Sequence, residues 1–167
     1  LDGSFTCTLF MPFQDTEYSF EKLTNKEEVN KFFKNKFPDF YQLIPDISEH
    51  WDEFPTSSLA LIKCDPWHIG NTALLGDAAH ATVPFYGQGM NAGFEDCSIL
   101  WELAKKHSWN WLEVFEEYSK TRKPDGDALQ ELSLDNYFVM RDFVADPQFI
   151  LQKKFEKRIT ELYPNDY

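Results

Sequence analysis

The sequence of 167 residues predicts a mixed fold of the α/β or α+β class, in which helices accompany a sheet. The first observation is an alternating segment, residues 4–11, whose side chains suit a strand with two different faces. The second is the apolar run of residues 72–75, which stops at Gly76 as a buried strand would. The third is the helical spacing of apolar residues in several later segments.

The first part of the chain is expected to hold two strands and one helix. Thr24 and Glu27 form a capping box, and the apolar residues after it repeat at helical spacing until Pro38 ends the helix. Residues 58–64 predict a second strand that returns toward the sheet. Phe10 lies on the more polar face of the first strand, where lining a substrate pocket and ordinary sheet packing are about equally favoured.

A tight turn and a strand then lead into a loop rich in glycine and proline. Gly70 and Asn71 suit the turn that precedes the strand at residues 72–75. Asp77 follows the end of this strand, where its carboxylate can accept two hydrogen bonds from the hydroxyl groups of a polyol or ribose. Two alanines come next, and their small side chains let such a ligand approach closely.

The loop continues into a helix that we expect from Asn91 to about Lys105, with Glu95 and Asp96 in its first turn. The glycines at positions 87, 89 and 93 let the backbone present bare amides to a ligand. The positive end of the helix faces the same loop, so it would stabilise a ring system that becomes anionic on reduction. A flavin is such a ring.

Three more helices are expected after this one. Asn110 can cap a helix that Pro124 ends, and the next helix covers about residues 127–144. Asp146 and the proline after it open the last helix, which extends to about residue 162.

The middle helix of these three carries an apolar stripe with one polar member, Asn136. A buried amide needs hydrogen-bond partners, so Asn136 is either a satisfied core residue or a group presented to a polar ligand. Spacing alone favours the core interpretation. The stripe consists of Leu129, Leu132, Asn136, Met140 and Phe143.

The segment GDAAHATVPFYGQGMNAGFEDC, residues 76–97, resembles the second FAD-binding motif of the class A flavoprotein aromatic hydroxylases. In that motif the aspartate binds the ribityl chain, and the following loop and helix start hold the isoalloxazine. Nearly the whole chain is similar to the later part of the members that act on L-kynurenine. The similarity is clearest at residues 4–13, 83–97 and 132–141.

The resemblance implies a fold and a division of the chain into three parts. The fold is part of a Rossmann-like FAD-binding domain together with a β-sheet substrate domain and C-terminal helices. Residues 1–66 would belong to the substrate-binding sheet domain with its scaffold helix. Residues 67–107 would form the C-terminal part of the FAD-binding domain, and residues 108–167 would form a C-terminal helical region.

The resemblance also implies site residues, because the family's loop lies between flavin and substrate. Pro84 and the two aromatic residues after it can form a flat wall beside a planar ring, and Gln88 offers a neutral amide. An asparagine at the place of Asn136 helps to bind the amino-acid part of the substrate in the family. The expected cofactor-binding residues are Gly76, Asp77, Pro84, Gly87, Gly89, Met90 and Asn91. The expected substrate-binding residues are Phe10, Pro84, Phe85, Tyr86, Gln88 and Asn136.

The activity that the resemblance implies is the 3-hydroxylation of L-kynurenine. NADPH reduces FAD, the reduced flavin reacts with O2, and a flavin hydroperoxide transfers one oxygen atom to the aromatic ring. This chemistry requires no catalytic side chain and no metal. The first FAD element of the family, a GxGxxG turn, does not occur in the sequence. We therefore expect the chain to be a fragment, completed by an N-terminal segment of the same polypeptide.

Composition excludes some other classes of protein. Aromatic residues make up 17% of the chain, which is ample for a folded core, and the net charge of −12 argues against binding to nucleic acid. The three cysteines, Cys7, Cys64 and Cys97, suggest reduced core thiols.

The sequence shows no membrane span and no signal peptide, so the chain itself is expected to be soluble. Eukaryotic members of the resembled family carry a C-terminal membrane anchor, which is absent from this sequence. The resemblance therefore implies that the full-length protein lies on the mitochondrial outer membrane and faces the cytosol.

Three alternatives remain open at the level of sequence. One is a class A flavin hydroxylase with another aromatic substrate. Another is a non-catalytic binding fragment, which is favoured if the native polypeptide lacks a GxGxxG half. The least favoured is a hydrolase or metal enzyme built on Asp77 and His80, because no nucleophile is indicated beside this histidine.

Overall fold

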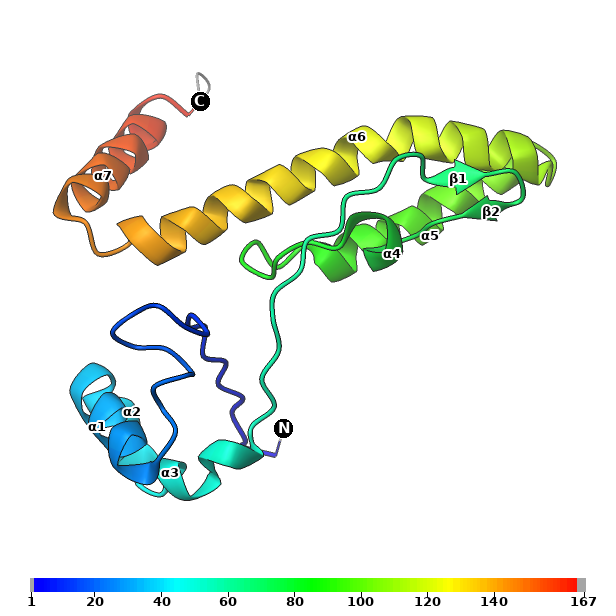
Figure 1. The fold of residues 1–167 in the computed structure, drawn as a ribbon. Coiled ribbons are helices and arrows are strands. Elements are labelled where there is room, and N and C mark those ends of the chain that lie inside the picture. The colour runs from blue at the N-terminus through cyan, green and yellow to red at the C-terminus, as the bar shows by residue number, and fades with distance from the viewer. Residues whose placement is uncertain (1, 165–167) are drawn as a thin grey trace. The chain divides into compact units, whose positions relative to one another are not determined.

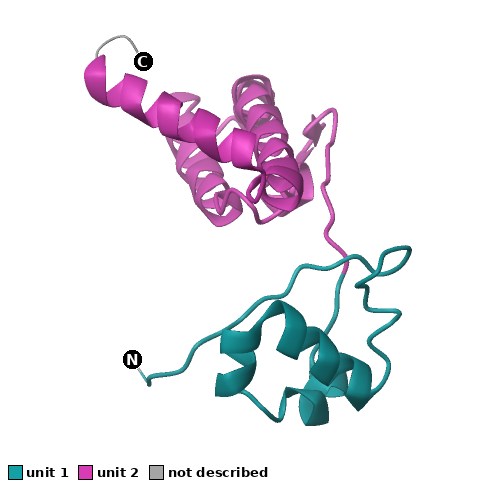
Figure 2. Ribbon diagram, turned by 90° about the vertical axis from the view of Figure 1, so that its left-hand side faces the viewer, with its two compact units in different colours: residues 1–57 teal, residues 58–167 magenta. Residues whose placement is uncertain are grey.

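The computed structural model describes residues 2–164, and it is mostly helical, with one small sheet (Figure 1). The chain divides into two compact units between Ser57 and Ser58 (Figure 2). The structure contains both helices and a sheet, as the mixed class predicts, but helices dominate among the described residues.

Unit 1 is a cluster of short helices around an aromatic core. It contains α1 (Lys26–Lys36), α2 (Pro38–Leu43), α3 (Ile47–His50) and a 3-10 turn (Trp51–Glu53). The side chain of Asn25 accepts a hydrogen bond of 3.0 Å from the Glu28 amide, so Asn25 caps the helix, one residue after the predicted Thr24. The buried apolar core consists of Leu23, Val29, Phe32, Phe33 and Ile47.

Residues 4–11 and 58–64 are not strands in this structure, contrary to prediction. A strand is held by hydrogen bonds to a neighbouring strand, and no described strand lies beside either segment. The strands among the described residues are β1 (His68–Ile69) and β2 (Thr72–Ala73), which pair antiparallel. Their two-residue turn at positions 70 and 71 confirms the predicted turn.

Unit 2 is built on two long helices. Its elements after the hairpin are α4 (Asp77–His80), α5 (Gly89–Lys106), α6 (Trp111–Phe138), a π-helical turn (Val139–Phe143) and α7 (Pro147–Leu162). Helices α5 and α6 pack side by side (Figure 1). The start of α7 is confirmed, because the Asp146 carboxylate accepts hydrogen bonds from the amides of Gln148 and Phe149 at 2.7 and 3.0 Å.

Helix α6 continues through Pro124, where the sequence predicted a break. A proline inside a helix costs about 3 kcal/mol because it removes one backbone hydrogen bond. Side chains on both sides of Pro124 are buried against the rest of unit 2, and this packing outweighs the local cost. The buried residues of α6 are Val114, Tyr118, Ser119, Arg122, Gly126, Gln130 and Ser133.

The buried face of α6 therefore differs from the predicted apolar stripe. Leu132 of that stripe is 50% exposed, and Met140 and Phe143 are also exposed. The core of unit 2 instead consists of Trp67, Ala79, Leu103, Ala104, Val114 and Tyr118.

The three cysteines are free thiols, as predicted. Their predicted place in the core is wrong for Cys7 and Cys97, which are exposed, whereas Cys64 is partly buried. Among the described residues, no helix is both long and apolar enough to cross a membrane.

Candidate functional site

The main chain at Gly76 directs Asp77 to the start of α4. Gly76 has φ +56° and ψ −136°, a conformation that residues with a Cβ rarely adopt. Its carbonyl accepts hydrogen bonds of 2.9 Å from the amides of Ala79 and His80, so it caps the short helix. The Asp77 side chain is exposed, and it makes no hydrogen bond or ion pair with any described residue. A carboxylate in this state is available to a ligand.

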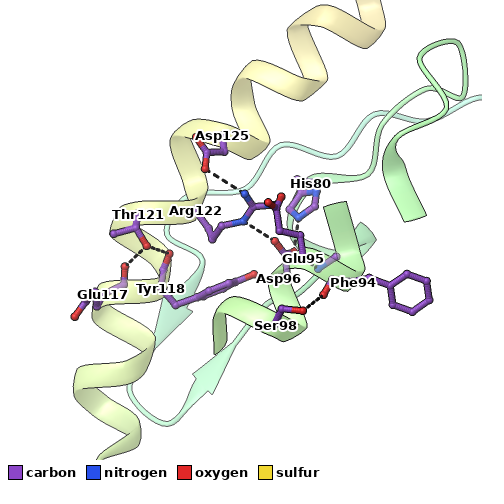
Figure 3. A network of polar contacts seen from close by, with 11 residues as sticks. His80, Phe94, Glu95, Asp96, Ser98, Glu117, Tyr118, Thr121, Arg122 and Asp125 are labelled. Carbon is purple, nitrogen blue, oxygen red and sulfur yellow. Dashed lines mark hydrogen bonds and ion pairs between the residues drawn. The ribbon is translucent and has the colours of Figure 1, made fainter. Parts of the chain in front are cut away.

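The buried carboxylate of Asp96 joins three parts of unit 2 (Figure 3). Its Oδ2 accepts a hydrogen bond of 3.0 Å from the Gly76 amide and lies 2.6 Å from Nε2 of His80. Its Oδ1 accepts a bond of 2.8 Å from Nε of Arg122 on α6. Because a carboxylate only accepts, Nε2 of His80 carries the proton in this contact.

The charge of Asp96 is stabilised inside the protein. Burial raises the pKa of the Asp96 carboxyl, whereas hydrogen bonds from His80, Arg122 and Gly76 lower it. The lowering is larger, so the pKa lies below its usual value. Burial, together with the negative charge of Asp96, raises the pKa of the Tyr118 hydroxyl. The cluster thus holds a carboxylate and a neutral phenol at physiological pH.

The start of α5 presents unpaired backbone amides. The helix begins at Gly89, two residues before the predicted start, and no side chain caps it. The first turn contains no acidic residue, so the prediction that Glu95 and Asp96 belong to it is wrong. The amide of Ala92 is the first to bond within the helix, to the Gln88 carbonyl at 2.9 Å. The amides of residues 89–91 therefore lack helical acceptors and can bind an anionic or electron-rich group.

The loop before α5 is closed by short contacts. The amide of Gly87, which has φ +67°, donates to the Pro84 carbonyl at 3.2 Å. A Cβ on Gly89 would lie 3.1 Å from the Thr82 hydroxyl oxygen, so this helix start packs tightly on the loop. The side-chain amide of Asn91 donates to Oε1 of Gln88 at 2.8 Å. Two of the predicted site residues thus already contact each other.

Helix α6 reaches the same loop through Asn136. The Asn136 side-chain amide donates to the Phe85 carbonyl at 2.5 Å, and the rings of Phe85 and Tyr137 lie 4.9 Å apart. Tyr86 is exposed. Phe10 belongs to unit 1, unlike the other predicted site residues. The structure therefore brings Phe85 and Asn136 together and ties the predicted substrate wall to α6.

The alternative of a hydrolase or metal enzyme requires His80 to pair with Asp77, but the two side chains make no such contact. His80 is buried, bonds to Asp96 and stacks on Trp67 with ring centroids 5.0 Å apart. In the part of the chain that the structure describes, no three His, Cys, Asp or Glu side chains are grouped so that they could hold a metal ion. The contacts of His80 with Asp96 and Trp67 support a structural role.

Residues 23–133 match the protein family described as "FAD binding domain". The chain belongs to this family. It is similar over its whole length to proteins named kynurenine 3-monooxygenase, with 50% identity to that of Flavobacterium psychrophilum, 49% to that of Flavobacterium johnsoniae and 43% to that of Dictyostelium discoideum. These matches cover 37%, 37% and 39% of the respective relatives. The chain thus spans little more than a third of the length of the curated relatives it matches.

The residues of the loop fit the cofactor of the FAD binding domain family. The exposed Asp77 carboxylate can accept hydrogen bonds from ribityl hydroxyl groups. The uncapped start of α5 offers amides and a positive dipole end, which suit the ring of a reduced flavin. Both features lie in one segment of unit 2, within the matched residues.

Sequence reasoning missed the part that Asp96 and Arg122 have in this site. The signal was present: Asp96 stands at helical spacing with Ala92, Ile99 and Leu103, all of them apolar. A charge on an apolar face has to be paired when it is buried. Arg122 on the next predicted helix is its natural partner, but two separate helices could not be placed side by side from spacing alone.

Proposed function

We propose that the full-length protein is an FAD- and NADPH-dependent monooxygenase that hydroxylates L-kynurenine at position 3. The observation that carries this proposal is the 50% identity, over the whole chain, to a relative named kynurenine 3-monooxygenase. The geometry of the loop supports it, because an available carboxylate and an uncapped helix start occur together in the matched segment.

In this proposal the chain's own residues bind and orient the cofactor. Asp77 holds the ribityl hydroxyl groups, and Gly76, Pro84 and Gly87 shape the backbone beside the ligand. The amides of Gly89, Met90 and Asn91 would stabilise negative charge on the ring. When bound, FAD would supply the chemistry, which is reduction by NADPH followed by transfer of one oxygen atom from O2 to an aromatic ring.

The same loop would form one side of the substrate site. Pro84, Phe85 and Tyr86 would pack against the aromatic ring of L-kynurenine, and Gln88 would bind its polar groups. Asn136 would bind the amino-acid part of the substrate while its side-chain amide holds the Phe85 carbonyl. Phe10 would be a further substrate-binding residue, as the resemblance implies.

The proposal includes parts of the protein that lie outside this sequence. An N-terminal segment of the same polypeptide would supply the GxGxxG turn for the rest of FAD. Residues 1–66 would then belong to the substrate domain, 67–107 to the FAD-binding domain and 108–167 to the helical region. Attachment to the mitochondrial outer membrane through a C-terminal anchor remains an expectation from the resemblance, which fractionation of cells that produce the full-length protein would test.

Purification of the full-length protein tests the proposal directly. We expect a yellow protein with the absorbance of bound flavin, and NADPH oxidation that depends on L-kynurenine and yields 3-hydroxykynurenine. Asp77→Ala should lose flavin, whereas Asp39→Ala, an exposed change on α2, should retain it. If a different aromatic compound stimulates NADPH oxidation, that compound takes the place of L-kynurenine as the proposed substrate. A colourless protein that takes up no FAD would contradict the proposal and favour the non-catalytic alternative.

A further inference from the structure

The Asp96 side chain makes contacts that a purely internal ion pair would not need. An ion pair with Arg122 requires only Oδ1, to which Nε of Arg122 donates at 2.8 Å. The other oxygen, Oδ2, receives the Gly76 amide at 3.0 Å and Nε2 of His80 at 2.6 Å. One buried carboxylate therefore binds α6 with one oxygen and the segment around α4 with the other.

The two partners of Asp96 Oδ2, Gly76 and His80, lie on either side of Asp77 in the sequence. Gly76 is the residue before Asp77, and His80 is the last residue of the four-residue helix α4 that begins at Asp77. A helix of one turn has little stability of its own, so its direction depends on contacts at its ends. Asp96 supplies a contact at each end. The orientation of the exposed Asp77 carboxylate is thereby coupled to a residue that is itself inaccessible.

The members of the network are buried and held by several contacts each. Asp96 and His80 are 0% and 1% exposed, and the His80 ring is stacked on the buried Trp67. The Arg122 guanidinium also binds Glu95 at 3.0 Å and Asp125 at 3.1 Å, which fixes it from the solvent side (Figure 3). Side chains locked in this way can hold a neighbouring backbone in one geometry.

We propose that Asp96 is a positioning residue for the flavin site, which orients Asp77 through the Gly76 amide and through His80. This inference rests on the proposed binding of FAD by Asp77 and adds the residue that sets its geometry. Asp96 itself makes no contact with the cofactor. Its substitution should weaken FAD binding only to the extent that Asp77 contributes to it.

A double-mutant cycle on the full-length protein tests the coupling. The FAD dissociation constant is measured by flavin fluorescence for wild type, Asp96→Asn, Asp77→Asn and the double variant, below the unfolding temperature of each. We expect Asp96→Asn to weaken binding about tenfold, and the double variant to bind no more weakly than Asp77→Asn alone. Glu102→Gln is the matched control, since it removes an exposed carboxylate of α5 that pairs with Lys105 and contacts no member of the network. It should leave FAD affinity unchanged.

Two results would overturn the inference: an unchanged FAD affinity in Asp96→Asn, or losses that multiply in the double variant. If Asp96→Asn does not fold, His80→Leu and His80→Gln replace it, because glutamine keeps a donor for Asp96 and leucine does not. Leucine should then weaken FAD binding more than glutamine, and equal affinities would contradict the inference. Wild-type protein that binds no FAD would refute the proposed function itself, whereas wild-type binding with unaffected variants refutes only the positioning role.

Discussion

Single residues decide how closely the elements of unit 2 approach one another. Gly126 on α6 faces the buried Trp67, and a Cβ at this position would lie 2.7 Å from Cη2 and 2.9 Å from Cζ2 of that ring. The Trp67 ring has little freedom to move away, because it packs between His80 and Tyr118 at centroid distances of 5.0 and 5.8 Å. The absence of a side chain at Gly126 therefore allows α6 to pack closely against the Trp67 ring.

Gly126→Ala should destabilise the protein, although alanine is the better helix former. Helix propensity alone would add about 1 kcal/mol to the free energy of unfolding. Overpacking against Trp67 should cost about 1–3 kcal/mol and prevail, so we expect a net loss of stability. Urea unfolding followed by circular dichroism measures the difference. Lys120→Ala, an exposed change on the same helix, is the control and should have little effect. A more stable Gly126→Ala variant would mean that Trp67 moves freely.

The site residues that sequence reasoning could propose are those whose predicted function depends on local chain geometry. Asp77 follows directly on Gly76, and the glycines of the loop precede a helix, so neighbouring positions suffice to recognise them. Asp96 was missed because its function depends on Gly76 and Arg122, which lie 20 and 26 positions away. Only the packing of α5 on α6 brings these groups together.

At the scale of elements, helix starts were predicted better than helix interiors. Asp146 and the following proline mark the start of α7 because capping is a local interaction. Pro124 was expected to end a helix, yet α6 continues because tertiary packing on both sides of it outweighs the lost hydrogen bond. The start of α5 was placed too late because Gly89, a poor helix former, is its first residue.

The free energy of unfolding should depend on pH through contacts between the end of α5 and the start of α6. His107, at the C-terminal end of α5, lies 2.6 Å from a Glu117 carboxylate oxygen and 2.9 Å from one of Glu113. Hydrogen bonds to Glu117 and Glu113 raise the pKa of His107 above its usual 6.5. A raised pKa means that folding favours the charged form, so this stabilisation is complete below pH 6.5 and is lost as the pH rises through the folded-state pKa.

Comparison of wild type with His107→Gln tests this dependence. Urea unfolding between pH 6 and 9 should show a stability difference that shrinks as the pH rises above about 6.5. A titration of the His107 ring by NMR should give a pKa above 6.5. His50→Gln is the control, since His50 lies in unit 1. A stability difference that stays constant over the whole pH range would show that His107 contributes by packing alone.

At the scale of the whole molecule, the strands were the least successful prediction. Residues 58–64 have a strand-like sequence, but among the described residues their backbone has only one hydrogen bond to the backbone of another segment, from the Ile62 amide to the Ala81 carbonyl at 3.2 Å. The Ile62 carbonyl accepts a further bond from the side-chain amide of Gln130. Sheet formation depends on neighbours that can be remote in sequence, and the chain spans only 37% of its first relatives. Sequence alone reveals the tendency of the segment and not its partner.

We expect residues 58–64 to acquire strand partners in a protein as long as those relatives. Hydrogen exchange should then be fast for the amides of 58–64 in the 167-residue chain and slow in the full-length protein. The amides of α5 should be protected in both, which provides an internal control for folding. Equal and rapid exchange in both proteins would show that the segment remains irregular.

The unbroken α6 has a consequence for the length of this part of the chain. Arg122, which binds Asp96, and Asn136, which binds the Phe85 carbonyl, lie on the same helix about 21 Å apart along its axis. One inserted or deleted residue between them would turn Asn136 by about 100° relative to Arg122. Point substitutions on the outer surface of this stretch are therefore tolerable, whereas one residue more or fewer would prevent Arg122 from reaching Asp96 while Asn136 reaches the Phe85 carbonyl.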